Sequence, residues 1–143
     1  MNAKLYELKK VQTKFPRKKI TSSQDGYDFI RQFFGDDIEI YESFFILLLD
    51  RANNTLGYAK ISQGGIVGTV VDVKLIAKYA VESLASGIVL AHNHPSGNLL
   101  SSREDISVTK KIVNALSFLD VIVLDHLILT TEGYHSFADN GEL

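Results

Sequence analysis

Two histidines stand one residue apart at the end of an apolar run, in the stretch LAHNHPSGNLLSSRED of residues 90–105. In an extended chain, residues i and i+2 project to the same face, so His92 and His94 can direct their imidazoles at one point. Pro95 keeps His94 extended and ends the strand there. Because imidazole nitrogen is a common zinc ligand, this spacing indicates a metal site.

Asp105, at the start of the next expected helix, is the third candidate ligand. With about 100° of rotation per residue, it lies in line with a stripe of apolar residues that must face the core. This stripe comprises Val108, Ile112, Leu116 and Leu119. A carboxylate at the head of a buried stripe is costly unless it is paired, hydrogen-bonded or bound to a metal. His92, His94 and Asp105 would supply three ligands and leave a fourth position for water, as in a catalytic zinc site.

The same segment also has an explanation that needs no metal. A serine followed three residues later by an acidic residue is a capping box, which starts a helix. Two such pairs overlap here: Ser101 with Glu104, and Ser102 with Asp105. Only one pair can cap the helix. If Ser101 and Glu104 do so, Ser102 and Asp105 remain free for a site.

The elements that must position these residues predict an α/β fold, with a mixed β-sheet flanked by helices. Apolar runs and turn residues predict strands at 41–50, 58–65, 87–92, 121–131 and 133–137. Helical spacing with capping residues predicts helices at 21–35, 71–86 and 101–120. The two histidines would then end a central strand, and Asp105 would begin the helix that follows it.

Length and composition fit one globular domain of 143 residues, with 45% apolar residues. The sequence has no cysteine, so disulfides, iron–sulfur clusters and thiolate zinc sites are excluded. No apolar run approaches the ~20 residues of a membrane span, and the first residues lack the apolar core of a secretory signal. We therefore expect a cytoplasmic protein without membrane contact.

Charge is unevenly distributed, although the net charge is only −2. Residues 1–20 carry a balance of +6 and the rest of the chain −8, so we expect a basic arm at 1–20 and the main domain at 21–143. A basic arm can bind nucleic acid through phosphates. It can equally be a strand docked on an acidic body, or a solvated leader.

The motif HNHPSG followed by SxxDxxxT resembles the JAMM motif of the JAB/MPN+ metallopeptidase superfamily, and specifically its RadC-like branch, often labelled DNA repair protein RadC. Six stretches follow the order of that branch: ESFFILLLD, GGIVGT, LAHNHPSGN, SREDISVTKKI, VIVLDHLIL and YHSFADNG. The resemblance covers roughly residues 20–143. It implies a JAB/MPN (cytidine-deaminase-like) architecture and one Zn²⁺ held by His92, His94 and Asp105.

The resemblance also implies an activity. The catalytic glutamate of the family falls on Glu42, which shares a strand face with Phe44. The implied reaction is zinc-dependent hydrolysis of a peptide or isopeptide bond in a protein or peptide substrate. Glu42 would take a proton from a zinc-activated water and deliver it to the leaving nitrogen. Ser102, beside Asp105 on the first helical turn, is placed to donate a hydrogen bond to the developing oxyanion.

Other functions remain to be weighed. HNH nucleases spread those three letters over some thirty positions, and cytidine deaminases need His-x-Glu and two cysteines, so neither class fits. A JAB-fold binding module without turnover is a further hypothesis. The main alternative function is a DNA-repair-associated adaptor that binds nucleic acid through its basic arm.

Two more histidines need an explanation. Asp125 and His126 interrupt the apolar run VIVLDHLILT. Asp125 either orients a ligand histidine, or the two residues are an internal polar pair satisfied by backbone, which is the interpretation we favour. His135 is expected at the surface or in a turn.

Overall fold

The computed structural model describes residues 1–7, 9–64 and 70–143. Within these ranges the strands are β1 (Glu42–Leu49), β2 (Thr55–Gly64), β3 (Gly87–Asn93), β4 (Ile122–Leu129) and β5 (Tyr134–Ser136). They form one sheet in the order β2–β1–β3–β4–β5. Strand β3 is parallel to β4, and the other neighbouring pairs are antiparallel. The prediction of an α/β fold with a mixed sheet is confirmed.

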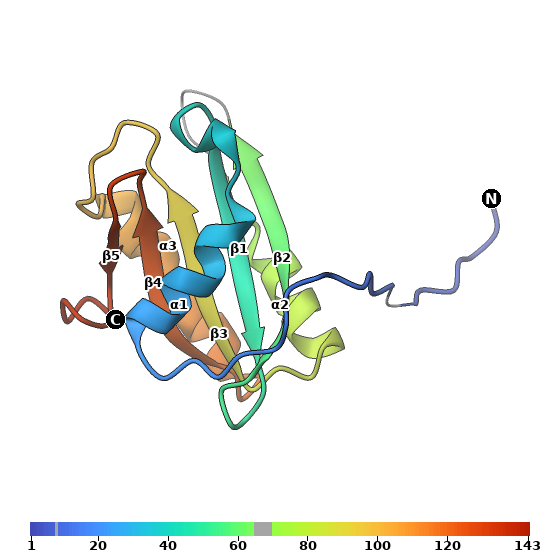
Figure 1. The fold of residues 1–143 in the computed structure, drawn as a ribbon. Coiled ribbons are helices and arrows are strands. Elements are labelled where there is room, and N and C mark those ends of the chain that lie inside the picture. The colour runs from blue at the N-terminus through green and yellow to red at the C-terminus, as the bar shows by residue number, and fades with distance from the viewer. Residues whose placement is uncertain (8, 65–69) are drawn as a thin grey trace.

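The helices of the described residues lie on both faces of this sheet (Figure 1). They are α1 (Ser23–Ile30), α2 (Val73–Glu82) and α3 (Arg103–Ser117), and α1 continues into the short 3-10 helices η1 (Arg31–Phe33) and η2 (Asp36–Glu39). None of the described helices is both long and apolar enough to cross a membrane. The last residue of the strand expected at 58–65, and most of the stretch GGIVGT, lie outside the described residues.

Strand β1 is apolar on both faces because both faces of the sheet are covered. Phe44, Ile46 and Leu48 pack in the cluster formed with α2 and α3. Phe45 and Leu47 pack in the opposite cluster, formed with α1. Since side chains alternate along a strand, Glu42 at the start of β1 projects to the α2/α3 face. Strand β1 lies inside the sheet, between β2 and β3.

A one-residue irregularity at Leu124 of β4 changes which side chains face α3. Before it, Val123 packs on the α2/α3 face, and after it, Leu127 packs on the α1 face. Strict alternation from Val123 would have pointed His126 toward α1. The bulge turns His126 to the same face as His92.

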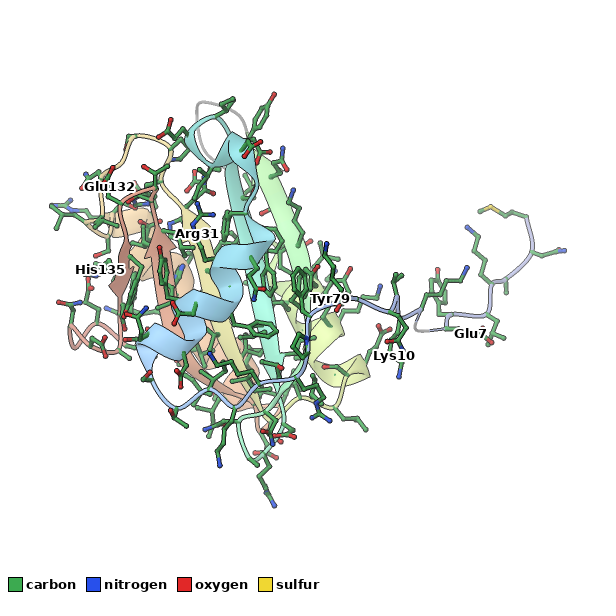
Figure 2. All side chains as sticks on the ribbon, viewed as in Figure 1. Glu7, Lys10, Arg31, Tyr79, Glu132 and His135 are labelled. Atoms are coloured by element: carbon green, nitrogen blue, oxygen red, sulfur yellow. The ribbon has the colours of Figure 1, made fainter. Side chains whose placement is uncertain are left out.

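The basic arm has two parts. From Phe15 on, it lies against the domain: Lys18 accepts a 2.9 Å hydrogen bond from the backbone N–H of Thr55, and Arg17 forms a 3.1 Å ion pair with Asp50. The preceding residues extend away from the domain (Figure 1), and Figure 2 shows Lys10 projecting from this extended part. The exposed lysines of this part are Lys4, Lys9, Lys10 and Lys14.

Candidate metal centre

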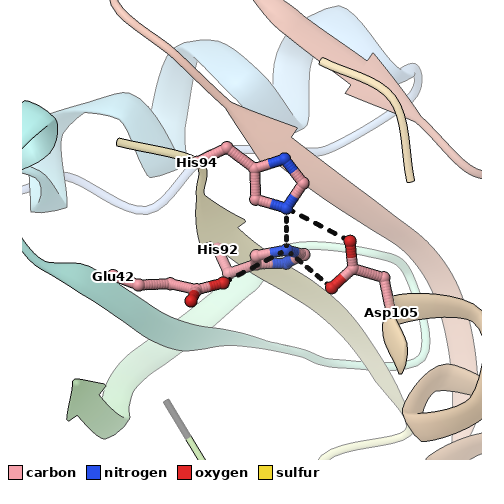
Figure 3. Close-up of side chains that lie close together, drawn as sticks. All are labelled: Glu42, His92, His94 and Asp105. Carbon is pink, nitrogen blue, oxygen red and sulfur yellow. Dashed lines mark hydrogen bonds and ion pairs between the residues drawn. The ribbon is translucent and has the colours of Figure 1, made fainter. Parts of the chain in front are cut away.

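Four side chains from three elements meet at one end of the sheet (Figure 3). They are Glu42 from β1, His92 and His94 from the end of β3, and Asp105 from the first turn of α3. One possible ligand atom from each lies within 4.8 Å of all the others. The structure thus brings together the three predicted ligands and the glutamate that the resemblance implied.

The distances among these groups are short. His92 Nε2 lies 3.0 Å from His94 Nε2 and 3.2 Å from Asp105 Oδ1. His94 Nε2 lies 3.1 Å from Asp105 Oδ2. Glu42 stands slightly farther out, with Oε1 3.8 Å from His92 Nε2. Two imidazole nitrogens and one carboxylate therefore converge on a single point, and a second carboxylate lies beside them.

The end of β3 holds His94 in place. Its backbone N–H donates to Leu129 O at 2.9 Å, which extends the pairing with β4 by one residue. After Pro95, Gly97 takes a φ of 84° and reverses the chain. The reversal brings Asn98 O to 2.6 Å from His94 Nδ1. Since a carbonyl only accepts, His94 Nδ1 carries the proton and Nε2 is left to bind.

The helix cap fixes Asp105 rather than competing with the site. Ser102 Oγ accepts from Asp105 N at 3.0 Å, and Asp105 Oδ2 accepts from Ser102 N at 2.9 Å. The alternative in which Ser101 and Glu104 form the cap is wrong, because Ser101 Oγ instead donates to Glu142. A carboxylate accepts several hydrogen bonds, so Asp105 serves the cap and still faces both histidines.

The apolar stripe of α3 differs from the prediction at one position. Ile112 and Leu116 are fully buried, as expected, but Leu119 is 44% exposed. Helix α3 ends at Ser117, so Leu119 lies beyond its last turn. Midway along the helix, the buried face also includes Thr109.

Opposite charges set the protonation of the site. Burial alone would raise the pKa of Asp105, but hydrogen bonds from His92 and His94 hold that pKa far below its usual range. Burial also works against charge on His94, yet hydrogen bonds to Asp105 and Asn98 outweigh it and raise the pKa of His94. The carboxylate stays ionised, and His94 gains affinity for a positive charge.

Asn93, between the two histidines, faces the other side of β3 and fastens the chain that carries Glu42. It is fully buried. Its Oδ1 accepts from Ser43 N at 2.8 Å, and its Nδ2 donates to Ile38 O at 2.6 Å and to Tyr41 O at 2.7 Å. Sequence reasoning missed this role, although a polar residue at an inward position of a buried strand was a signal for it.

A second contact missed from the sequence involves His126. Its Nε2 lies 2.7 Å from His92 Nδ1, and its Nδ1 lies 2.6 Å from Thr109 Oγ1. Burial lowers the pKa of His126 well below its usual value. The motif offered a signal, because Thr109 follows Asp105 by one helical turn on the same face.

Asp125 does not orient a ligand histidine, so that interpretation is wrong. It points to the α1 side, where its oxygens accept from Ser136 Oγ at 2.6 Å and from Ala138 N at 3.0 Å. The favoured interpretation, an internal polar pair satisfied by backbone, holds in part for Asp125, which accepts from the backbone N–H groups of His126 and Ala138 as well as from the Ser136 hydroxyl. It is wrong for His126, whose partners are side chains. His135 is half-buried in β5, not in a turn, and its Nε2 hydrogen-bonds to Glu142.

A cavity of about 110 Å³ opens at this cluster of side chains. Its lining includes Glu42, His92 and Asp105, with Phe44 and Val71 as apolar walls. A larger hollow of about 190 Å³ lies on the opposite face, at the start of α1, and none of the four clustered side chains lines it. Of these two cavities, the smaller is therefore the one in contact with the clustered side chains.

Comparison with known proteins assigns this chain to one protein family. The family model of the RadC-like JAB domain matches residues 20–142. The chain belongs to the RadC-like JAB domain family, which confirms the resemblance found in the sequence. The chain is 46% identical over 124 residues to a UPF0758 protein of Flavobacterium johnsoniae and 41% identical over 128 residues to one of Porphyromonas gingivalis.

These matches cover most of this chain but only part of each relative. They span 87% and 89% of the chain, and 53% and 56% of the two relatives. A UPF0758 protein of Coprothermobacter proteolyticus matches at 37% identity over 122 residues, which is 84% of this chain and 52% of the relative. The chain thus spans about half the length of the curated relatives it matches.

Proposed function

We propose that this domain is a zinc-dependent hydrolase that cleaves a peptide or isopeptide bond in a protein or peptide substrate. The observation that carries the proposal is the convergence of His92 Nε2, His94 Nε2 and the Asp105 carboxylate, at 3.0–3.2 Å from one another, with Glu42 beside them. The helix cap accounts for the bond of Asp105 to Ser102, but it does not require two imidazoles turned toward the same carboxylate.

The donor set fits zinc. Two imidazole nitrogens and one carboxylate oxygen are a ligand combination found in catalytic zinc sites, which keep a position for water or substrate. Nitrogen and oxygen donors are also what a sequence without cysteine can offer. When bound, zinc would supply Lewis-acid chemistry and lower the pKa of a water molecule to ~7.

Glu42 and Ser102 would carry the remaining steps. Glu42 is the first residue of β1, and its carboxylate lines the cavity beside the two histidines and Asp105. There it can accept a proton from the attacking water and pass it to the leaving nitrogen. Ser102 Oγ accepts from the backbone N–H of Asp105. Its own O–H can therefore donate to the substrate oxygen as negative charge develops there.

The test measures metal and cleavage separately. Protein purified without added metal, and then equilibrated with zinc, is analysed for metal content as wild type, His94→Ala and Glu42→Gln. We expect one zinc per wild-type chain and per Glu42→Gln chain, and loss of zinc in His94→Ala. Cleavage of a mixed peptide library, followed by mass spectrometry, should occur only with the wild type. Equal zinc in wild type and His94→Ala would contradict the proposal.

A second candidate function is binding of nucleic acid through the arm. The part of the arm before Phe15 extends from the domain with four exposed lysines, whereas Arg17 is engaged by Asp50. A gel shift at several salt concentrations should show binding that weakens with salt and is lost when residues 1–14 are deleted. If neither the full chain nor the deleted form binds nucleic acid, this function is removed.

The proposed location of both activities is the cytoplasm, a reducing compartment that suits a chain without cysteine.

A further inference from the structure

A hydrogen-bonded chain of buried side chains runs from His92 into α3. His92 Nδ1 lies 2.7 Å from His126 Nε2, and His126 Nδ1 lies 2.6 Å from Thr109 Oγ1. Thr109 Oγ1 lies 2.6 Å from the backbone oxygen of Asp105. The exposed fraction of His92, His126 and Thr109 is 2% or less. These contacts are therefore made without competition from solvent.

The backbone carbonyl of Asp105, at the end of this hydrogen-bonded chain, fixes which atom donates and which accepts in every bond along it. A backbone carbonyl cannot donate, so Thr109 must donate its only hydroxyl proton to Asp105 O. Thr109 Oγ1 is then an acceptor, and the N–H on His126 must be at Nδ1. A neutral imidazole with its proton on Nδ1 has a lone pair on Nε2. His126 Nε2 therefore accepts, and His92 Nδ1 donates.

The other neutral tautomer of His126, with its proton on Nε2, is inconsistent with the same distances. If His126 carried its proton on Nε2, its Nδ1 would need the hydroxyl proton of Thr109. Thr109 Oγ1 and Asp105 O would then face each other as two acceptors at 2.6 Å with no proton between them. Such a contact is repulsive, and both atoms are buried where water cannot relieve it.

We propose that Thr109 and His126 are positioning residues that fix His92 as the Nδ1–H tautomer and so present its Nε2 lone pair to the metal. The tautomers follow from the hydrogen bonds together with the complete burial of His126, which keeps its ring neutral. Their consequence for metal binding rests on the proposed function. The hydrogen-bonded chain also links two of the proposed metal ligands, because it starts on the ring of His92 and ends on the backbone of Asp105.

Aromatic packing holds the ring of His126 at the required angle. Phe137 stacks on it at 4.6 Å between ring centroids with an interplanar angle of 26°, and Phe44 meets it edge-on at 5.5 Å. Phe44 also stacks on His92, at 5.8 Å and 8°. His126 is thus confined between two phenyl rings and His92 packs on one, which limits rotation and leaves the tautomer as the remaining choice.

The first test needs neither a variant nor a metal. Long-range ¹H–¹⁵N spectra of ¹⁵N-histidine-labelled, metal-free wild-type protein report which ring nitrogen of each histidine carries hydrogen. We expect Nδ1–H with a non-protonated Nε2 for His126, and a protonated Nδ1 for His92. A proton on His126 Nε2 with a non-protonated Nδ1 would overturn the inference, whether or not the protein binds zinc.

The second test removes the anchor of the chain. Thr109→Val keeps the shape and loses the hydroxyl, so His126 should become a mixture of tautomers and zinc affinity should fall about 10–100-fold, as for other partners that orient a ligand histidine. Thr109→Ser should restore both properties. Thr55→Val is the matched control: it is also buried, and its hydroxyl accepts from Lys18 N, far from the site.

The outcomes separate this inference from the proposed function. If the wild type shows the expected tautomers but binds no zinc, the proposed function fails and the tautomer assignment stands. If zinc binds to the wild type and to a folded Thr109→Val protein with equal affinity, the positioning role is wrong. A Thr109→Val protein that does not fold leaves the test to Thr109→Ser and to the wild-type spectra.

Discussion

His92 Nε2 and His94 Nε2 lie 3.0 Å apart at the centre of the site. The other nitrogen of each ring faces its own partner, His126 for His92 and Asn98 O for His94. Two nitrogen lone pairs repel at such a distance, and a cation bound between them would remove that repulsion. The pair is therefore arranged as two ligands of one metal ion would be.

Asp105 has two roles that substitution can separate. Asp105→Asn keeps an oxygen for the backbone N–H of Ser102, so the helix cap survives, but it removes the anionic ligand. We expect zinc affinity to fall by more than the ~10–100-fold typical of partners outside the ligand set. The free energy of unfolding should also fall, because the amide loses the charged hydrogen bonds from His92 and His94 that lower the pKa of Asp105. Asp105→Ala should lose about 1 kcal/mol more, since it removes the helix cap as well. Chelator competition and urea unfolding measure the two quantities.

Glu42→Gln tests the transfer of the proton. The amide has nearly the shape of the carboxylate but cannot act as a base, so we expect turnover to fall about 10²–10⁴-fold. Zinc content should be unchanged, because Glu42 stands 3.8 Å from the nearest ligand nitrogen and outside the ligand set. A variant that keeps full activity with zinc bound would remove the role assigned to Glu42.

Ser102 can be tested without losing the helix. At an N-cap, glycine costs only a few tenths of a kcal/mol relative to serine, whereas alanine costs about 1 kcal/mol. Ser102→Gly should therefore unfold close to the wild-type urea concentration while turnover falls about 10²–10³-fold, the usual effect of losing one oxyanion donor. If Ser102→Gly retains wild-type turnover in the peptide assay, Ser102 is a helix cap and nothing more.

Asn93→Ala should destabilise the protein and displace Glu42. It removes three buried hydrogen bonds to the segment before β1. At ~1 kcal/mol each, the free energy of unfolding should fall by about 3 kcal/mol in urea titrations. Asn140→Ala is the control, since its side chain makes a single hydrogen bond, to Ser136 O, in an exposed segment. Equal losses of unfolding free energy in both variants would contradict the role of Asn93 in holding the segment before β1.

Asp125 makes a prediction about pH. Burial raises its pKa above 3.8, which means that the folded protein favours the protonated carboxyl. Its contribution to stability is therefore full below 3.8 and is lost as pH rises through the raised pKa. Asp125→Asn removes this dependence and can still hydrogen-bond to Ser136. We expect the variant to gain stability relative to wild type as pH rises from 4 to 7, measured by urea unfolding. A difference that is independent of pH would contradict this.

Local sequence determined much of the site. Alternation along a strand placed His92 and His94 on one face, and the helical period placed Asp105 on the inward stripe of α3. These features depend on contacts within a few residues, so residue spacing alone can fix them. The apolar runs also predicted strands at the positions of β1, β3 and β4.

Tertiary structure decided the rest. Asn93 reaches Ser43 across 50 positions of the chain, and the irregularity at Leu124 turned His126 toward His92. Neither feature leaves a periodic trace, because a bulge and a long-range hydrogen bond depend on the register of neighbouring strands. The sequence by itself thus determined which groups can bind a metal, while sheet register decided which residues hold those groups at bonding distance.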